Sequence, residues 1–144
     1  MLLKEIMTPN VEVVRPDATL QQAATKMKAL NVGSLPVCTG KRIQGMITDR
    51  DITTRAVAAG QDPTQTKVQD IMTPDLHYCF DDQPVSEAAG LMQRYQIRRL
   101  PIVNRSNELV GIVALGDIAV DVDNHPLAGT TLETVSIPSK PDRA

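Results

Sequence analysis

The sequence predicts a mixed α+β (α/β) fold in which one β-α-β-β-α unit is present twice, because the residue patterns of the two halves repeat. The tetrapeptide Ile-Met-Thr-Pro occupies residues 6–9 and again residues 71–74. Identical residues keep this register through both halves, with one inserted residue. The period is longer than the roughly 20–45 residues of solenoid repeats, so it indicates two copies of one small unit that share an interface. The matched pairs include Asp17 and Asp82, Leu35-Pro36 and Leu100-Pro101, Gly45 and Gly111, and Asp51 and Asp117.

The first copy contains alternating strand and helix signals. Thr19 can cap a helix whose apolar residues recur at helical spacing from Leu20 onward. Pro36 lacks an N–H group, so its strand should lie at a sheet edge or leave one position unpaired. The expected elements are a strand at 11–14, a helix beginning at 20, strands at 34–38 and 43–48, and a helix from 48 to just before Gly60.

The second copy has the same order, and the two copies define the domain organisation. Its expected elements are a strand near 76–80, a helix at 85–95, strands near 100–103 and 108–114, and a helix from 115 to about 122. Asn104 to Asn107 form the expected hairpin turn. The domains predicted from the repeat are the first copy at 1–60, a linker at 61–67, the second copy at 68–124, and a C-terminal extension and tail at 125–144.

Composition excludes several classes of function. The net charge is −2 and only three residues are aromatic, which argues against nucleic-acid binding. Two histidines and two cysteines at scattered positions give no zinc-site spacing. No apolar stretch is long enough to span a membrane, and the N-terminus has no signal-peptide pattern. We therefore expect a cytoplasmic protein, with a Cys38–Cys79 disulfide as the less favoured state of the two thiols.

The repeated unit, with Met-Thr-Pro near its start, a Leu-Pro strand and Gly-x-x-Thr-x-x-Asp before the last helix, resembles the cystathionine-β-synthase (CBS) domain. The tandem arrangement is similar to a CBS pair, or Bateman module, and most resembles the small free-standing prokaryotic CBS-pair proteins. The resemblance covers residues 1 to about 124. It implies two repeats packed about a pseudo-two-fold axis, a homodimer, and an adenosine ligand bound in clefts between the copies.

The segment from Gly45 to Asp51 is the main candidate site, and two interpretations of it stay open. Thr48-x-x-Asp51 fits a helix capping box, which is a structural role. The resemblance instead implies that Asp51 holds the ribose hydroxyls, that the Thr48 hydroxyl lies beside the ribose or phosphate, and that Met46 packs against the base. A carboxylate at a strand-to-helix junction is suited to accept hydrogen bonds from a ribose diol.

The second copy tests the capping interpretation. It keeps Asp117, but Ala114 stands where Thr48 stands in the first copy. Without the hydroxyl, one of the two hydrogen bonds of a capping box cannot form, which favours another role for Asp117. The same change removes a hydroxyl from the ligand site, so we expect a weaker second site at Asp117, Ile112 and Val11.

Two adjacent arginines precede the Leu-Pro strand of the second copy. The resemblance implies that Arg98 and Arg99 reach the phosphates of a nucleotide held at Thr48 and Asp51, and the guanidinium fork suits phosphate. The first copy has the uncharged Gly33 and Ser34 at these positions. The alternative is an ordinary solvated pair of surface charges. Leu76 and Cys79 are candidate purine walls, although such residues are more often core.

These observations favour a non-catalytic regulatory module that binds AMP, ADP or ATP, with S-adenosylmethionine or NAD(H) as further possibilities, and that needs no cofactor. We expect no metal site, no nucleic acid and no membrane among its partners, and an unidentified regulated protein. Two other hypotheses stay open. One is a ligand-independent interaction or dimerisation module, and the other is a small enzyme that pairs His77 with Cys38 or Cys79.

Overall fold

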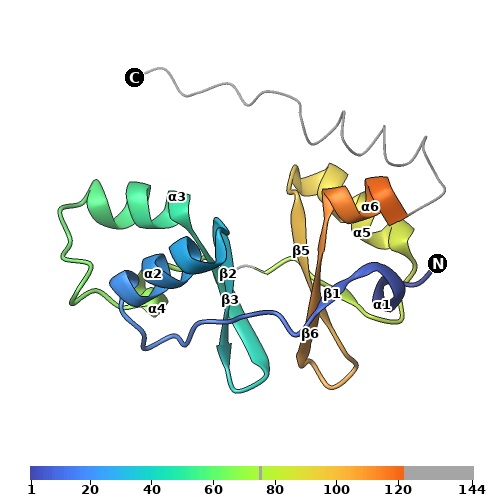
Figure 1. Cartoon of the computed structure of the whole chain (residues 1–144), viewed down its shortest axis with the longest axis horizontal. Coiled ribbons are helices and arrows are strands. Elements are labelled where there is room, and N and C mark those ends of the chain that lie inside the picture. The colour runs from blue at the N-terminus through green and yellow to red at the C-terminus, as the bar shows by residue number, and fades with distance from the viewer. Residues whose placement is uncertain (75, 122–144) are drawn as a thin grey trace. The chain divides into compact units, whose positions relative to one another are not determined.

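A computed structural model of the chain describes residues 1–74 and 76–121 (Figure 1). From residue 20 onward its elements follow the predicted order, with one additional short helix at Val68–Ile71. The extension predicted at 125–144 lies outside the described residues. The helices are α1 (Leu3–Ile6), α2 (Leu20–Leu30), α3 (Asp49–Asp51), the π-helical η1 (Ile52–Val57), α4 (Val68–Ile71), α5 (Val85–Tyr95) and α6 (Leu115–Asp121). The strands are β1 (Thr8–Pro9), β2 (Ser34–Thr39), β3 (Arg42–Thr48), β4 (Cys79–Phe80), β5 (Arg99–Val103) and β6 (Leu109–Ala114).

The chain forms two compact units that do not coincide with the two copies of the sequence repeat. Unit 1 comprises residues 1–11, 77–106 and the described residues from 110 onward. Unit 2 comprises the described residues from 12 to 76, together with 107–109. The first eleven residues of the chain therefore belong to the unit that contains the second copy.

The strands of unit 1 form one sheet in the order β1-β6-β5-β4. Strand β1 is antiparallel to β6 and places Thr8 opposite Ile112, while β4 is parallel to β5 and places Cys79 opposite Ile102. Helices α5 and α6 lie on one side of this sheet (Figure 1).

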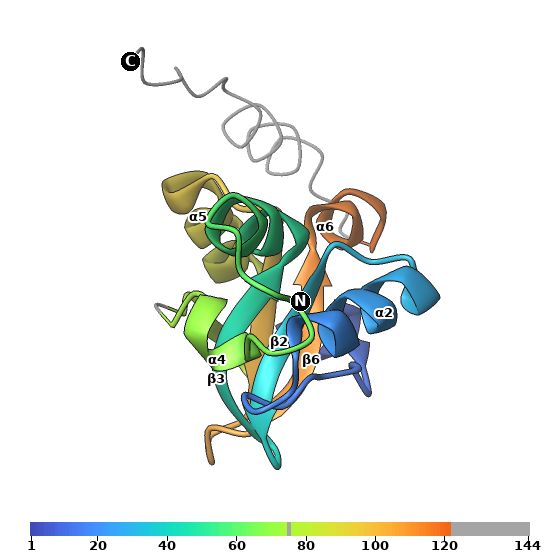
Figure 2. The ribbon, with the colours of Figure 1, turned by 90° about the vertical axis from the view of Figure 1, so that its left-hand side faces the viewer.

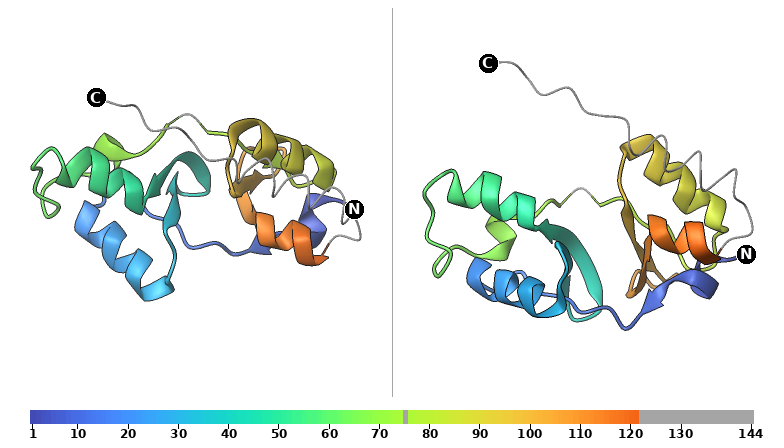
Figure 3. Two further views of the ribbon diagram at one scale, coloured as in Figure 1. Left: turned by 90° about the horizontal axis from the view of Figure 1, so that it is seen from above. Right: turned by 45° about the horizontal axis from the view of Figure 1, so that its top comes forward.

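Unit 2 repeats this arrangement, but single-residue bridges take the place of its two outer strands. Strands β2 and β3 form an antiparallel hairpin. An isolated parallel bridge joins Val14 to Val37, and an isolated antiparallel bridge joins Met46 to Thr73. Figure 2 shows unit 2 with α2 and α4 in front of this hairpin, and α2 and the α3–η1 helix lie on the same side of it (Figure 3).

Each unit is completed by a segment that begins the other copy of the repeat. In unit 1, the Leu3 amide donates to the Gln83 carbonyl over 2.9 Å. In unit 2, the Val68 amide donates to the Ala18 carbonyl over 2.8 Å. The two Ile-Met-Thr-Pro motifs are therefore exchanged, so that residues 6–9 pack with the second copy and residues 71–74 with the first. The local patterns of the sequence did not predict this exchange.

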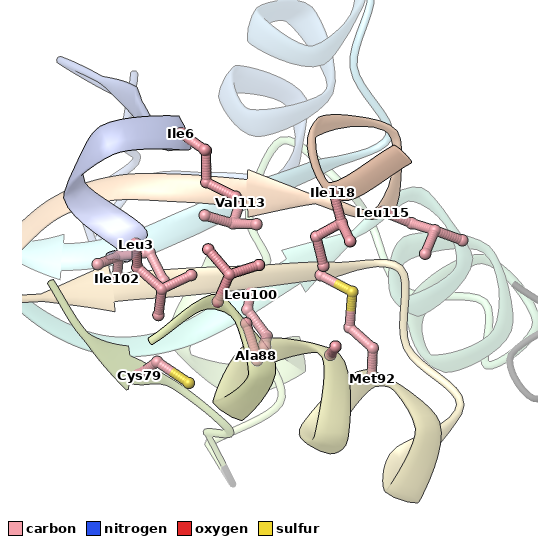
Figure 4. Close-up of a cluster of buried hydrophobic side chains, with 12 residues drawn as sticks. Leu3, Ile6, Cys79, Ala88, Met92, Leu100, Ile102, Val113, Leu115 and Ile118 are labelled. Carbon is pink, nitrogen blue, oxygen red and sulfur yellow. The ribbon is translucent and has the colours of Figure 1, made fainter. Parts of the chain in front are cut away.

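Each unit has its own aliphatic core, as the scarcity of aromatic residues requires. In unit 1, Leu3 and Ile6 of α1 enter the same cluster as Met92 of α5 and Ile118 of α6 (Figure 4). In unit 2, the cluster joins α2, β2, β3, η1 and α4. Its buried members are Val14, Leu20, Ala23, Met27, Leu35, Val37, Ile47, Ala56, Val68 and Ile71. Burial of these side chains is the main stabilising contribution to each unit.

Two local predictions need correction. Residues 11–14 do not form a strand, because only Val14 pairs, and the first strand is instead Thr8–Pro9. The helix expected from residue 48 is present, but its second part, Ile52–Val57, is π-helical. The Thr19 cap is confirmed, since its hydroxyl accepts a hydrogen bond from the Gln22 amide over 3.2 Å.

Gly111 allows β1 to lie against β6, and its replacement should be destabilising. A Cβ at Gly111 would lie 2.6 Å from Met7 Sδ and 2.9 Å from the Thr8 carbonyl oxygen. Gly111→Ala should therefore lower the free energy of unfolding by about 1–3 kcal/mol, as overpacking does. Gly90→Ala is the control, because a Cβ there meets nothing within 4 Å and should stabilise α5 by roughly 0.5–1 kcal/mol. Urea titrations that gave both variants the same sign of change would contradict this prediction.

An exposed ion pair in unit 1 should make stability depend on pH. Arg105 Nη2 donates to Asp82 Oδ1 over 2.8 Å, and its guanidinium carbon lies 4.1 Å from the Phe80 ring centroid. The hydrogen bond and charge of Arg105 hold the pKa of Asp82 below its usual range. Asp82 therefore stabilises the fold above the ordinary carboxyl pKa, and this contribution is lost as the pH falls through the lowered pKa.

Asp82→Asn should accordingly have a slightly lower Tm than the parent protein at pH 7. The difference should close as the pH falls through the acidic range, which thermal unfolding followed by circular dichroism can measure. A Tm difference that is independent of pH would show that the Asp82 charge contributes nothing.

In the described part of the chain, no helix is long and apolar enough to cross a membrane.

Candidate functional site

The Thr48–Asp51 element of unit 2 forms the capping box that its spacing allows. The Asp51 amide donates to Thr48 Oγ1 over 3.0 Å, and the Thr48 amide donates to Asp51 Oδ2 over 3.1 Å. Both residues are half-buried. The structure therefore confirms that Thr48 and Asp51 cap this helix.

The capping box leaves two polar groups available. Among the described residues, Asp51 Oδ1 makes no hydrogen bond, so one carboxylate oxygen keeps its capacity to accept. The Thr48 oxygen accepts from the backbone but keeps its own proton to donate. Met46 is half-buried and, by strand alternation, lies on the same face of β3 as Thr48. The element thus presents an acceptor, a donor and a flexible apolar side chain.

The corresponding element of unit 1 keeps half of the box. The Ala114 amide donates to Asp117 Oδ2 over 2.7 Å, so Asp117 still caps its helix. The loss of the hydroxyl therefore does not by itself indicate another task for Asp117. Asp117 and Ile112 are half-buried, and this element lacks the hydroxyl donor of Thr48.

The two arginines lie in unit 1. Arg99 is the first residue of β5, and both side chains are exposed. The Arg98 carbonyl accepts a hydrogen bond from the Leu115 amide over 2.8 Å, which ties the main chain of Arg98 to the start of α6. Among the described residues, neither guanidinium forms an ion pair. Their expected role toward a phosphate at Thr48 and Asp51 stays a prediction.

The candidate purine walls differ in exposure. Val11 and Leu76 are half-buried and lie outside regular elements. Cys79 is only 2 % exposed and belongs to the core of unit 1 (Figure 4). Of the two second-copy walls, Leu76 is therefore the more accessible to a ligand.

The groups of the enzymatic hypothesis are in environments unsuited to nucleophilic catalysis. Both cysteines are free and buried. Burial raises the pKa of the Cys38 thiol, and that of the Cys79 thiol, to about 11, so both are protonated at neutral pH. The His77 ring stacks on Tyr95 with centroids 3.6 Å apart. The cysteines are therefore core residues, and His77 packs against an aromatic ring.

Arg55 and the segment that it contacts were not predicted from the sequence. Arg55 Nη1 donates to the Ile71 carbonyl over 2.9 Å and to the Met72 carbonyl over 3.3 Å. The Thr73 amide donates to the Met46 carbonyl over 2.9 Å. The matched glycines Gly45 and Gly111 were the available signal, because a glycine inside a strand often marks a close approach of another backbone.

The fold and this site define the chain as a pair of CBS domains. The CBS domain model matches residues 3–57 and 68–123. A relative from Bacillus subtilis, the CBS domain-containing protein YhcV, is 45 % identical over 134 residues, which is 93 % of this chain and 94 % of that protein. The chain therefore belongs to the CBS-domain family, and its relatives include free-standing CBS-pair proteins of the same size.

Solved structures give the same assignment. Hypoxic Response Protein I, solved with two coordinated zinc ions, is 33 % identical with a TM-score of 0.78 over 85 % of this chain and 99 % of that one. CBSX2 in complex with AMP is 25 % identical with a TM-score of 0.73, over 85 % of this chain and 98 % of that one. The CBS pair of MJ0100, solved with 5'-methylthioadenosine and S-adenosyl-L-methionine, is 28 % identical with a TM-score of 0.72, over 83 % and 93 %. Within the described residues of the present chain, no three His, Cys, Asp or Glu side chains form a group that could hold a metal ion.

Proposed function

We propose that this chain is a non-catalytic regulatory module that binds an adenine nucleotide, AMP, ADP or ATP, and thereby senses the energy or metabolite state of the cytoplasm. The observation that carries the proposal is the open Oδ1 of Asp51 beside the Thr48 hydroxyl. A carboxylate oxygen is a suitable acceptor for a ribose diol. S-adenosylmethionine and NAD(H) contain the same diol and stay candidates, and the function requires no further cofactor.

Similar proteins support adenosine as the shared part of the ligand. CBSX2 was solved with AMP, and the CBS pair of MJ0100 with 5'-methylthioadenosine and S-adenosyl-L-methionine. These ligands differ in their substituent at the ribose 5' position but share the base and the diol. The groups at Asp51 and Met46 suit that shared part, so the element does not by itself select the substituent.

The two copies should differ in affinity. The Thr48 element has a carboxylate and a hydroxyl, whereas the Asp117 element has only the carboxylate. We therefore assign the stronger site to Thr48, Asp51 and Met46, and a weaker one to Asp117, Ile112 and Val11. Binding should shift the equilibrium between conformations of the module and so reach a regulated protein.

Isothermal titration calorimetry with AMP, ADP, ATP, NADH and S-adenosylmethionine tests this function. A ligand present at 100 times its dissociation constant should also stabilise the folded chain by about 2.7 kcal/mol, seen as a raised Tm. An absence of heat and of a Tm shift with all five compounds at millimolar concentration would refute the nucleotide proposal. Mass spectrometry of the protein as purified would identify a ligand that co-purifies.

A second candidate function is a ligand-independent interaction or dimerisation module, and one surface favours it. Unit 2 has a groove of about 530 Å³ beside α2 and the start of the α3–η1 helix. The exposed Leu30 and Val57 lie on the same two helices. A similar solved structure, that of a CBS-CP12 protein, is hexameric. We propose that the present chain also self-associates, as a homodimer. The groove is lined by Ala24, Met27, Lys28, Asn31, Val32, Gly33, Asp49, Ile52 and Thr53.

Light scattering after size-exclusion chromatography separates the two functions. Ala24→Glu places a charge in the groove, where Ala24 is exposed, and should convert a dimer built on this surface to a monomer. A purely structural dimerisation module would show this change together with a Tm that no nucleotide shifts. A nucleotide sensor would keep its ligand-dependent Tm.

A further inference from the structure

Arg55 lies on the helix that Thr48 and Asp51 cap, in the π-helical part that follows. Its Nη1 donates to the carbonyls of Ile71 and Met72 at 2.9 and 3.3 Å. These carbonyls end α4, and helix-terminal carbonyls lack partners within their own helix. A cation that donates hydrogen bonds there is favourable. Arg55 thus ties the end of α4 to the helix of the candidate site.

The segment held by Arg55 pairs directly with the strand that leads into the site. The Met46 amide donates to the Thr73 carbonyl over 3.1 Å, and the Thr73 amide donates back over 2.9 Å. The approach is close, because a Cβ at Gly45 would lie only 2.7 Å from the Thr73 carbonyl oxygen. Met46, which we assign to the base, is therefore held from outside its own hairpin.

These contacts form a closed circuit that includes the residues of the candidate site. From Met46 the circuit runs through Thr73 and Met72 to the Arg55 guanidinium, and along the helix back to Asp51 and Thr48. Each link outside the covalent chain is a hydrogen bond of 2.9 to 3.3 Å. We propose that Arg55 is a positioning residue for the nucleotide site, because it fixes the Met46 wall relative to the helix that carries Asp51. This inference rests on the proposed function.

The sequence of the second copy has no arginine that matches Arg55. The repeat register that aligns Asp51 with Asp117 aligns Arg55 with Asp121, and an ionised carboxylate cannot donate a hydrogen bond to a carbonyl. The described residues of the helix that begins at Leu115, Leu115–Asp121, are α-helical. The site with the arginine is thus the one with both the carboxylate and the hydroxyl.

The test compares Arg55→Gln and Arg55→Lys with Arg42→Gln, a control that removes an exposed positive charge elsewhere in unit 2. Calorimetry with AMP should show an affinity loss of roughly 3- to 30-fold for Arg55→Gln, a size typical of residues that act through others. Arg55→Lys keeps a cationic donor and should recover part of the loss, whereas Arg42→Gln should bind as the parent does. In Arg55→Gln, NMR hydrogen exchange should be faster at the Thr73 and Met46 amides and unchanged at Ile102 in unit 1.

A positioning role also predicts reciprocity. Saturating AMP should slow exchange of the Thr73 amide in the parent protein and do so less in Arg55→Gln, an effect that a merely structural role would not give. If the parent binds AMP and both Arg55 variants bind it within twofold of the parent, the inference is wrong while the proposed function stands. If the parent binds none of the five compounds, the proposed function fails and this inference fails with it. If Arg55→Gln does not fold, the decision rests on Arg55→Lys.

Discussion

A fragment of residues 12–76 is expected to fold cooperatively, whereas a fragment of residues 1–60, the first copy of the repeat, is expected to be largely unfolded. The shorter fragment loses Val68 and Ile71, which are 0 % and 3 % exposed in the core of unit 2. Burial of two such side chains contributes roughly 3–6 kcal/mol, and domains of this size are only marginally stable. The 1–60 fragment also retains Leu3 and Ile6, whose apolar partners in unit 1 it lacks.

Far-UV circular dichroism with urea titration can measure this difference. A fragment of residues 12–66 is the matched control, because it differs from 12–76 by the loss of α4, the Thr73 pairing and the bridge from Lys67 to Thr19. It should also fail to unfold cooperatively. Cooperative unfolding of 1–60 with a stability equal to that of 12–76 would show that the exchanged segments contribute little to the units.

The elements that could be predicted from the sequence are those fixed by local patterns. The helix predicted at 85–95 is α5 with the same bounds, because its apolar spacing and flanking residues are local signals. The Thr19 cap and the hairpin of β2 and β3 are signalled in the same way. The family could also be predicted, because its motifs occur twice in order and the CBS domain model matches both copies.

The exchange could not be predicted from these patterns, because it depends on a choice between nearly identical partners. Residues 6–9 and 71–74 have the same sequence, so either motif suits the edge of either hairpin. The chain connects them such that Thr8 pairs with Ile112 and Thr73 with Met46. Only tertiary structure distinguishes this pairing from the one in which each copy uses its own motif.

The candidate site shows a similar division. Asp51 and Thr48 could be singled out because their spacing is that of a capping box, and the structure shows that box. Arg55 could not be singled out, because its partners are the backbone carbonyls of Ile71 and Met72. Every residue has such a carbonyl, so the sequence does not indicate which one is a partner. The π-helical turn that carries Arg55 has no reliable residue signature either, although π-helical turns are often found near functional sites.

Asp51→Ala is expected to weaken AMP binding by about 10- to 100-fold, whereas Asp117→Ala should change it by less than about threefold. A hydrogen bond to a charged group contributes about 1.5–3 kcal/mol, which corresponds to this loss in affinity. Of these two carboxylates, that of Asp51 lies beside a hydroxyl donor that can hold the same ligand.

The two variants are matched controls for folding, because each removes a carboxylate that accepts one backbone amide, from Thr48 or from Ala114. Each should therefore lose a similar amount of stability, about 0.5–2 kcal/mol. Equal stability loss with unequal ligand affinity separates the two interpretations of the motif, since a pure cap would leave calorimetric AMP binding unchanged in both. A larger affinity loss in Asp117→Ala than in Asp51→Ala would place the stronger site in unit 1, where the exposed Arg98 and Arg99 stand at positions that are Gly33 and Ser34 in the first copy.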